Sequence, residues 1–215
     1  MVTAVTIGYD LRLKHPAVYR DDVDYLYFTD GQSLPVDTQW QVHELPKGIT
    51  DDPRKLAKIP KLNPHMIPAL CDYRYVIWVD GSMRIVNDNF VEEVLSFLDN
   101  GLVLSPHWED RDCGYEEAAV LMETGYANQD LKGQCDFYLS QQFPKHYGLY
   151  AAGLQARDMN VYQVKIFGEI WFQEVLDWTS RDQVSCGYAL WKSGLTPDVL
   201  DKSFPEYNWV EINAH

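Results

Sequence analysis

Short apolar runs of β-branched and aromatic residues recur along the chain and predict strands. The clearest is Tyr75–Val79 (YVIWV), in which no polar residue alternates with the apolar ones. A strand without alternation is typical of a sheet that is covered on both faces. Similar runs predict further strands at residues 2–8, 24–30, 40–45, 102–105, 150–157 and 209–215.

Helical periodicity separates many of these runs. Pro53 follows Thr50-Asp51-Asp52 and predicts a helix start, and further helices are expected at residues 90–98, from 116 onward, 130–142, 162–178 and 184–191. The strand-helix-strand order over residues 74–105 indicates a parallel pair with a right-handed crossover. We therefore predict an α/β fold: one domain over residues 1–215, with a central, mixed but mostly parallel sheet of about six strands flanked by helices.

The amino-acid composition limits the kinds of molecule that the protein is expected to bind. The 215 residues include 46% hydrophobic ones, enough for one sizeable core. Thirty-two acidic residues against 18 basic ones give a formal charge of −14, which repels nucleic-acid phosphates and anionic membrane surfaces. The acidic excess is compatible with a site for a divalent cation, although a solvated acidic surface is the commoner explanation.

The cysteines and the N-terminus indicate in which cellular compartment the protein is expected. Cys71, Cys113, Cys135 and Cys186 form no CxxC pair and no zinc spacing, so we expect reduced thiols. The start of the chain lacks the basic and long apolar regions of a signal peptide, and no apolar stretch is long enough for an integral membrane segment. A soluble, cytoplasmic protein is expected.

Asp80 is the first candidate site residue. It directly follows the apolar run that ends at Val79, and open α/β sheets bind ligands beyond the carboxyl ends of their strands. By the same argument the end of the first predicted strand, with Thr6 and Tyr9, should face the site. An equally simple structural explanation is that Asp80 caps a turn before Gly81.

Basic residues precede the Asp80 strand. Arg54 and Lys58 are four residues apart and share one predicted helical face, and Lys61 follows just beyond Pro60. Such a patch in an acidic protein suits a diphosphate. A solvated helix face paired with neighbouring acids explains it equally well.

Two polar segments follow. Residues 106–117 carry seven charged or imidazole side chains, which makes His107, Arg111 and Glu116 candidates for ligand contact. In Ser180-Arg181-Asp182-Gln183, helix capping suffices to explain Ser180 and Asp182. Arg181 and Gln183 have no such explanation.

These segments together resemble the GT-A (Rossmann-like) class of nucleotide-sugar glycosyltransferases. Within it the chain looks most like a plant and viral group first described as a domain of unknown function. The matching segments are 58–61 (KIPK), 77–82 (IWVDGS), 107–117 (HWEDRDCGYEE), 171–172 (WF) and 181–183 (RDQ). The start Val-Thr-Ile-Gly-Tyr also resembles the first domain of a chlorella-virus glycosyltransferase, which would place the protein in the host-cell cytoplasm as one domain of a longer polypeptide.

The resemblance implies a metal site and its ligands. Asp80-Gly81-Ser82 stands where these enzymes carry a DxD motif that binds ribose and a divalent metal, Mn²⁺ or Mg²⁺. Ser82 replaces the second aspartate and is a weaker ligand for a hard cation. His215 resembles the histidine that often supplies another ligand.

The resemblance also implies the reaction. The expected function is metal-dependent transfer of a sugar from a UDP-sugar to a glycan or glycoprotein acceptor. Asp182 and Gln183 would line the reacting sugar carbon. Donor contacts would come from Thr6, Tyr9, Arg54, Lys58, Lys61, Asp80, Gly81, His107, Arg111 and Glu116. The Arg-Asp-Gln segment looks more like the retaining branch, but Asp182 could also be the general base of an inverting enzyme.

Two other functions stay open. Ser82 and the end of the chain at His215 are compatible with a nucleotide-sugar binding module without turnover. A sugar nucleotidyltransferase would have the same kind of sheet and would also use a bound metal ion. However, Gly8-Tyr9-Asp10 is acidic where such enzymes usually carry a basic, glycine-rich loop.

Overall fold

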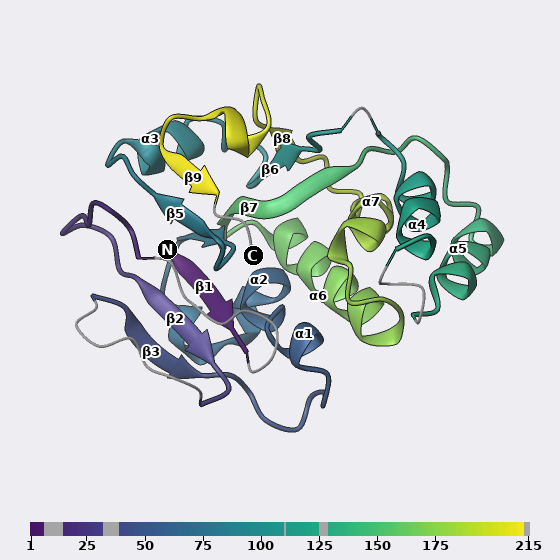
Figure 1. Cartoon of the computed structure of the whole chain (residues 1–215), viewed down its shortest axis with the longest axis horizontal. Helices are drawn as coiled ribbons and strands as arrows, with labels where there is room; N and C mark the ends of the chain where they lie inside the picture. The colour runs from purple at the N-terminus through teal and green to yellow at the C-terminus, as the bar shows by residue number, and fades with distance from the viewer. Residues whose placement is uncertain (7–14, 32–38, 110, 125–128, 213–215) are drawn as a thin grey trace.

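A computed structural model describes residues 1–6, 15–31, 39–109, 111–124 and 129–212 (Figure 1). The strands are β1 (Val2–Val5), β2 (Leu26–Thr29), β3 (Gln41–Glu44), β4 (Tyr75–Val79), β5 (Met83–Ile85), β6 (Leu102–Pro106), β7 (Tyr150–Asp158), β8 (Asp198–Val199) and β9 (Val210–Ile212). The α-helices are α1 (Pro53–Leu56), α2 (Ile59–Leu62), α3 (Phe90–Leu95), α4 (Gly114–Met122), α5 (Leu131–Ser140), α6 (Tyr162–Asp177) and α7 (Asp182–Ser193), and the 3₁₀ turns are η1 (Pro64–Met66), η2 (Pro68–Leu70) and η3 (Phe204–Glu206).

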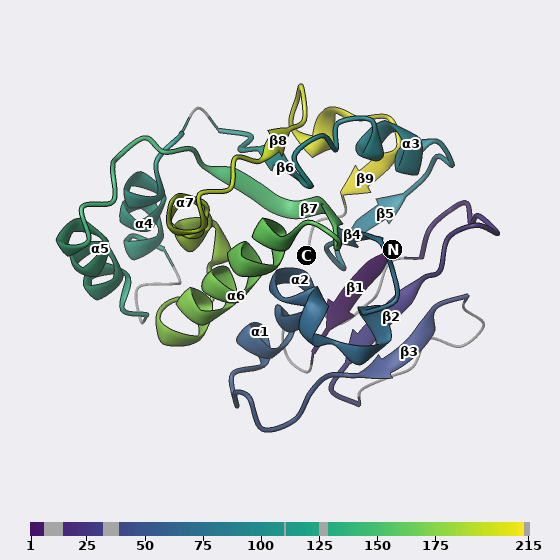
Figure 2. The ribbon, with the colours of Figure 1, turned by 180° about the vertical axis from the view of Figure 1, so that it is seen from behind.

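The central sheet has the order β3-β2-β1-β4-β7-β6-β8. Its pairs are parallel except at β7, which runs antiparallel to both β4 and β6. Views from both sides show β2 and β3 at one end of the molecule and α4 and α5 at the other (Figures 1 and 2). The predicted α/β class with a mostly parallel sheet flanked by helices is confirmed.

Both faces of the sheet are buried at β4, as the lack of alternation in this strand predicts. Val76 and Trp78 join a core formed with α2, α6 and α7, whereas Ile77 and Val79 join a second core formed with α3, η3 and β9. Successive side chains of a strand point to opposite faces, so each face receives its own apolar set. Asp80 therefore leaves the sheet at a strand that is anchored from both sides.

The predicted parallel pair over residues 74–105 is wrong in one respect. β4 and β6 run in the same direction, but β7 lies between them and pairs with both. A strand from much later in the chain is inserted there, which local order cannot show. The last strand, β9, also lies outside the main sheet and pairs with β5 in a separate two-stranded sheet.

Other differences concern element boundaries. The helix expected from Pro53 is two short helices, α1 and α2, and α7 begins at Asp182 rather than Val184. The short strands β5 and β8 lie outside the predicted strands, because segments of two or three residues carry no periodic pattern. The four cysteines are unpaired, as expected. Among the described residues, the longest helices are too short or too polar to span a bilayer.

Candidate active site

Asp80 occupies a tight turn at the end of β4. Its backbone N–H donates to the carbonyl of Gly153 at 2.9 Å, and its own carbonyl accepts from the N–H of Met83 at 2.9 Å. The indole Nε1 of Trp78 donates to Asp80 Oδ1 at 2.6 Å. The sequence left open whether Asp80 caps a turn or belongs to a binding site. Both explanations apply: its backbone forms the turn, and its half-exposed carboxylate lines a pocket.

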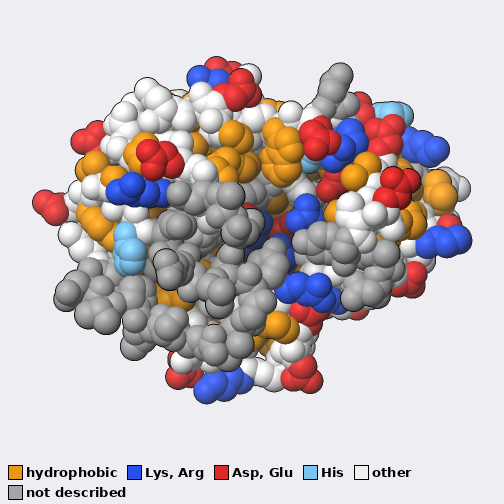
Figure 3. All heavy atoms as spheres, in the orientation of Figure 1, with side chains coloured by type: hydrophobic (Ala, Val, Ile, Leu, Met, Phe, Trp, Pro, Cys, Tyr) orange, Lys and Arg blue, Asp and Glu red, His pale blue; other side chains and the backbone are white. Residues whose placement is uncertain are grey.

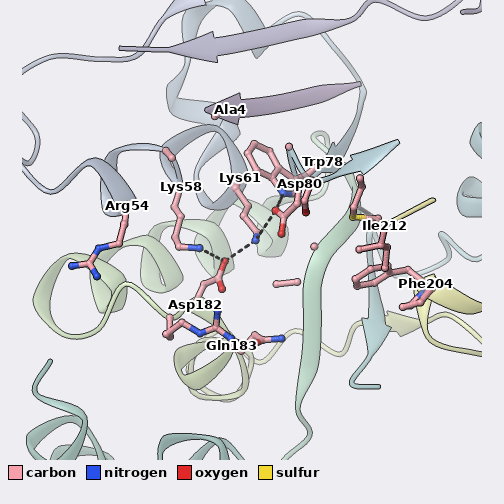
Figure 4. A pocket seen from close by; sticks show the side chains of 18 of the residues that line it. Ala4, Arg54, Lys58, Lys61, Trp78, Asp80, Asp182, Gln183, Phe204 and Ile212 are labelled. Atoms are coloured by element: carbon pink, nitrogen blue, oxygen red, sulfur yellow. Dashed lines mark hydrogen bonds and ion pairs between the residues drawn. The ribbon is translucent and has the colours of Figure 1, made fainter. Parts of the chain in front are cut away.

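Two lysines and a second carboxylate continue from Asp80 in one chain of ion pairs. Lys61 Nζ lies 3.1 Å from Asp80 Oδ1 and 2.8 Å from Asp182 Oδ2. Lys58 Nζ lies 2.9 Å from the same Asp182 oxygen. The side chains of Lys58, Lys61 and Asp182 are largely buried, so the pairs are little screened by water (Figure 4).

Burial and charge set the pKa values of this chain. Burial alone would raise the pKa of Asp182, but the charges of Lys58 and Lys61 outweigh it and hold that pKa well below its usual range. Burial would lower the pKa of Lys61, yet Asp182 and Asp80 raise it above its usual value. Asp182 is therefore an ionised carboxylate and a weak base at neutral pH.

A buried hydrogen-bond network holds the backbone on both sides of these ion pairs. Trp171 Nε1 donates to the carbonyl of Asp182 at 2.8 Å. Gln155 Nε2 donates to the carbonyl of Lys61 at 3.2 Å, and Arg157 donates to the carbonyl of Leu62 at 2.9 Å. Arg157 also donates to Gln155 Oε1, so the groups form one continuous unit.

Arg157 is the centre of this network. It is 1% exposed, and its guanidinium lies over the rings of Phe167 and Trp171 at 5.4 and 5.9 Å. Burial lowers its pKa from the ordinary value. We infer that Arg157 positions α2, and through it the lysines, without reaching the pocket.

A cavity of about 460 Å³ lies over the ion pairs. Figure 3 shows this face of the molecule hollowed near its centre, with acidic and basic side chains meeting in the hollow. The lining comes from β1, the α1–α2 segment, β4, β5 and the turn between them, the loop after β6, β7, the start of α7, η3 and β9. The lining residues are Ala4, Arg54, Ala57, Lys58, Lys61, Trp78, Asp80, Gly81, Ser82, Met83, Trp108, Ala152, Gly153, Arg181, Asp182, Gln183, Phe204, Pro205 and Ile212.

Gly153 keeps the middle of this cavity open. A Cβ placed on it would lie 3.2 Å from Asp80 Oδ2, 3.2 Å from Phe204 Cζ and 3.4 Å from Met83 Sδ. A side chain there would therefore fill the space between the carboxylate and the aromatic ring. The absence of a side chain at Gly153 lets the cavity reach the backbone of β7.

Seven of the predicted site residues line the cavity together: Arg54, Lys58, Lys61, Asp80, Gly81, Asp182 and Gln183, and the predicted metal ligand Ser82 joins them. Arg54 also pairs with Asp52 at 3.2 Å. The sequence left open whether the basic segment binds a diphosphate or pairs with neighbouring acids. The structure shows pairing with acids, but the acid that binds Lys58 and Lys61 is itself a predicted site residue, Asp182.

Thr6 and three residues of the polar loop lie elsewhere. Thr6 is buried and donates to the carbonyl of Pro53 at 2.9 Å, which ties β1 to α1. His107 stacks on Trp108. Arg111 pairs with Glu109 and Glu117, and Glu116 is exposed beside Asp112 and His146. These four do not line the cavity, because their bonds and their elements direct them away from it.

Tyr9 and His215 lie outside the described residues, so their predicted roles stay predictions. The remaining groups of the cavity suit a divalent cation only in part. Asp80 Oδ1 already accepts two hydrogen bonds, which leaves Oδ2 and the Ser82 hydroxyl as oxygen ligands. Mg²⁺ and Mn²⁺ are often held by one or two protein oxygens together with substrate phosphates, and this donor set fits such binding.

Glu117, rather than its neighbour Glu116, connects the polar loop to the site. Glu117 is 3% exposed. Its carboxylate accepts a hydrogen bond from Arg111 at 2.6 Å and lies 3.7 Å from Arg181, which lines the cavity. Arg181 in turn donates to Gln183 Oε1 at 2.9 Å. The sequence signal was helical spacing, since Glu117 falls on the buried side of α4 with Ala118 and Leu121.

Replacing Glu117 with glutamine should lower the free energy of unfolding by about 2 kcal/mol, because two arginines would lose a buried counter-charge. Chemical denaturation measures this change. Glu116→Gln is the matched control, since Glu116 is exposed and should shift stability by less than about 0.5 kcal/mol. Equal effects of the two variants would contradict a special role for Glu117.

Comparison with known proteins yields three similarities. Residues 35–209 match a family model described as TOD1/MUCI70, glycosyltransferase-like domain. A protein of Arabidopsis thaliana named "Probable hexosyltransferase MUCI70" is 30% identical over 180 residues, which cover 79% of this chain and 28% of that protein. The chain thus spans little more than a quarter of the length of that relative.

The third similarity is to a solved structure. Core-mannan synthase A (CmsA/Ktr4) of Aspergillus fumigatus, in a Mn/GDP form, matches with a TM-score of 0.47 and 10% identity over 82% of this chain and 63% of that chain. The predicted resemblance to a viral protein stays a prediction, since none of these similarities tests it.

Proposed function

Because the chain belongs to the TOD1/MUCI70 glycosyltransferase-like domain family, we propose that it transfers a sugar from a UDP-sugar to a glycan or glycoprotein acceptor. The observation that carries the proposal is the cavity in which Lys61 joins Asp80 to Asp182. A nucleotide-sugar transferase needs positive charge for a diphosphate and negative charge for the sugar carbon, and this cavity offers both.

The cationic end of the cavity supports the choice of a diphosphate. Arg54 comes from α1, Lys61 from α2 and Lys58 from the turn between them, and the three lie along one side, as Figure 4 shows. Cleavage of a sugar–diphosphate bond leaves negative charge on the departing nucleotide, which nearby ammonium and guanidinium groups stabilise. UDP is the nucleotide implied by the resemblance of the site segments to nucleotide-sugar transferases.

We assign Asp182 to stabilisation of the sugar carbon. This carbon gains positive charge in the transition state, as in glycoside hydrolysis, and an ionised carboxylate beside it lowers the barrier. Because Asp182 is a weak base, we assign it this electrostatic role rather than removal of the acceptor proton. A retaining reaction fits this assignment, and NMR of the anomeric configuration in the product tests it.

Asp80 and Ser82 are the described residues of the cavity that would hold a divalent cation, Mn²⁺ or Mg²⁺. Such an ion would supply further positive charge next to the leaving diphosphate. The protein itself contributes the orientation of Asp80, whose carboxylate is fixed by Trp78 and Lys61.

The proposed function is tested first by nucleotide binding and then by turnover. Thermal shift with UDP, GDP and CMP, each with and without Mn²⁺, should show a selective, metal-dependent rise of the melting temperature with UDP. Hydrolysis or transfer of a UDP-sugar above a reaction without protein then separates an enzyme from a binding module. A chain that binds UDP without turning over any UDP-sugar would be a binding module.

Asp80 and Ser82 give a paired prediction about the metal. Asp80→Asn should weaken binding of UDP with Mn²⁺ by about tenfold to a hundredfold in calorimetry, because the proposed carboxylate ligand loses its charge. Ser82→Asp should strengthen Mn²⁺ binding by about tenfold, since it adds a second carboxylate.

Ser82→Ala is the control for the second variant and should change binding much less than Ser82→Asp changes it. If the affinity of the original protein for UDP did not depend on Mn²⁺, or if Asp80→Asn left that affinity unchanged, the proposed metal site would be contradicted.

A further inference from the structure

The cavity has two chemically different ends. Opposite the cations lies an apolar wall formed by Trp108, Phe204, Pro205 and Ile212 (Figure 4 shows Phe204 and Ile212 across from Arg54 and Lys58). Trp108 is 52% exposed, although large aromatic side chains usually bury most of their surface. An exposed indole in the wall of a cavity is a surface for a ligand.

Trp108 packs against two neighbouring rings. Its ring stacks on His107 with centroids 4.5 Å apart and meets Phe204 edge to face at 6.3 Å. Phe204 is buried, and its backbone N–H donates to Ser105 Oγ at 3.0 Å, which fastens η3 to the end of β6. These ring contacts restrict the orientation of the indole, so it loses less freedom when a ligand stacks on it.

The apolar wall adjoins the ion pairs directly. Gly153 separates Asp80 Oδ2 from Phe204 Cζ, and both lie 3.2 Å from where its side chain would begin. A ring that rests against Trp108 and Phe204 therefore reaches the carboxylate over bare backbone. Pyranose rings have an apolar C–H face that packs on aromatic rings and hydroxyl groups that face polar side chains.

We propose that Trp108 and Phe204 form the binding platform for a pyranose ring of the acceptor glycan. The inference rests on the proposed function, since it assigns the acceptor side of the same cavity. The acceptor is favoured over the donor sugar because half of the indole faces solvent, where a longer glycan can continue, whereas the cations that suit the donor diphosphate lie at the opposite end.

The test measures sugar binding without requiring turnover. Saturation-transfer NMR is recorded on the full chain with methyl α- and β-glycopyranosides of the common hexoses and pentoses, in the presence of UDP and Mn²⁺. We expect contact through the C–H face of at least one glycoside, and a loss of affinity of about tenfold or more in Trp108→Ala. Trp108→Phe keeps a ring and should retain part of the binding.

Tyr162→Ala is the matched control, because Tyr162 is an aromatic residue that is 68% exposed at the start of α6 and does not line the cavity. It should leave glycoside binding unchanged. Calorimetry with UDP separates the two claims: a chain that binds glycosides but not UDP contradicts the proposed donor and leaves the platform standing.

Three results would overturn the platform. They are an original protein that contacts none of the glycosides, a Trp108→Ala variant that binds them as well as the original, and a Trp108→Ala variant that loses UDP binding as strongly as glycoside binding. The last result would assign the indole to the donor.

Discussion

Replacing Asp182 with asparagine is expected to lower turnover of the UDP-sugar by about a hundredfold to a thousandfold, the cost of losing one preorganised electrostatic group. The free energy of unfolding should fall by about 3 kcal/mol, because Lys58 and Lys61 would keep their charges without the shared carboxylate. Asparagine has nearly the same size, so both effects report charge rather than packing. Urea unfolding and donor hydrolysis measure them.

Asp136→Asn is the control for this variant. Asp136 pairs with Lys132 on the exposed side of α5, and such surface pairs contribute less than about 1 kcal/mol. If Asp182→Asn were as stable as Asp136→Asn, the ion pairs would not hold α2 against α7. If it were as active as the original protein, Asp182 would not act on the sugar.

The effect of Asp182→Asn on stability should depend on pH. The pKa of Asp182 lies well below its unfolded value of about 3.9, so its stabilisation is complete at neutral pH and is lost as the pH falls from that value toward the folded pKa. The difference in unfolding free energy between the original protein and the variant should therefore shrink on acidification. Parallel curves from neutral pH to the acid limit of folding would refute the depressed pKa.

Replacing Gly168 with valine is expected to cost about 3 kcal/mol of stability and to weaken UDP binding. Gly168 lies in the middle of α6, and a Cβ there would be 2.6 Å from the carbonyl oxygen of Leu62 and 3.0 Å from the Arg157 guanidinium. The carbonyl belongs to the backbone of α2 and cannot turn aside. Moving α2 would displace Lys58 and Lys61 from Asp182.

Gly168→Ala tests the same contact through the sign of the change in unfolding free energy. In an exposed helix this change would stabilise by about 1 kcal/mol, because alanine is the better helix former. Here it should destabilise, since the Cβ itself makes the clash. Gln163→Val, on the exposed first turn of α6, controls for the valine and should change stability by less than about 1 kcal/mol. A stabilised Gly168→Ala would show that α2 and α6 have room between them.

Local pattern was enough for most elements of the fold. Tyr75–Val79 is a strand with the predicted bounds, and α6 ends one residue before the predicted helix. Both segments are long and strongly apolar, so burial and propensity favour the same structure. The position of β7 between β4 and β6 followed from no local pattern, since any of several strands could have paired with β4.

The candidate site divides in the same way. Asp80, Lys58, Lys61, Asp182 and Gln183 were found from strand ends, helical spacing and resemblance, and they line one cavity. Neither Trp108, although it lies in a segment that carries the resemblance, nor the buried Arg157 was singled out from the sequence. A lone tryptophan in a charged loop and an arginine in a strand each have many possible environments, and only their neighbours in space distinguish them.

The sequence by itself determined that Asp80 ends a buried strand, because an apolar run that stops at a carboxylate and a glycine cannot continue into the core. It did not determine which charges would meet that carboxylate. Lys58 and Asp182 are 124 residues apart and come together because α2 and α7 both pack on the same face of the sheet. Ion pairs depend on distance in space, and that distance was set by the packing of the core.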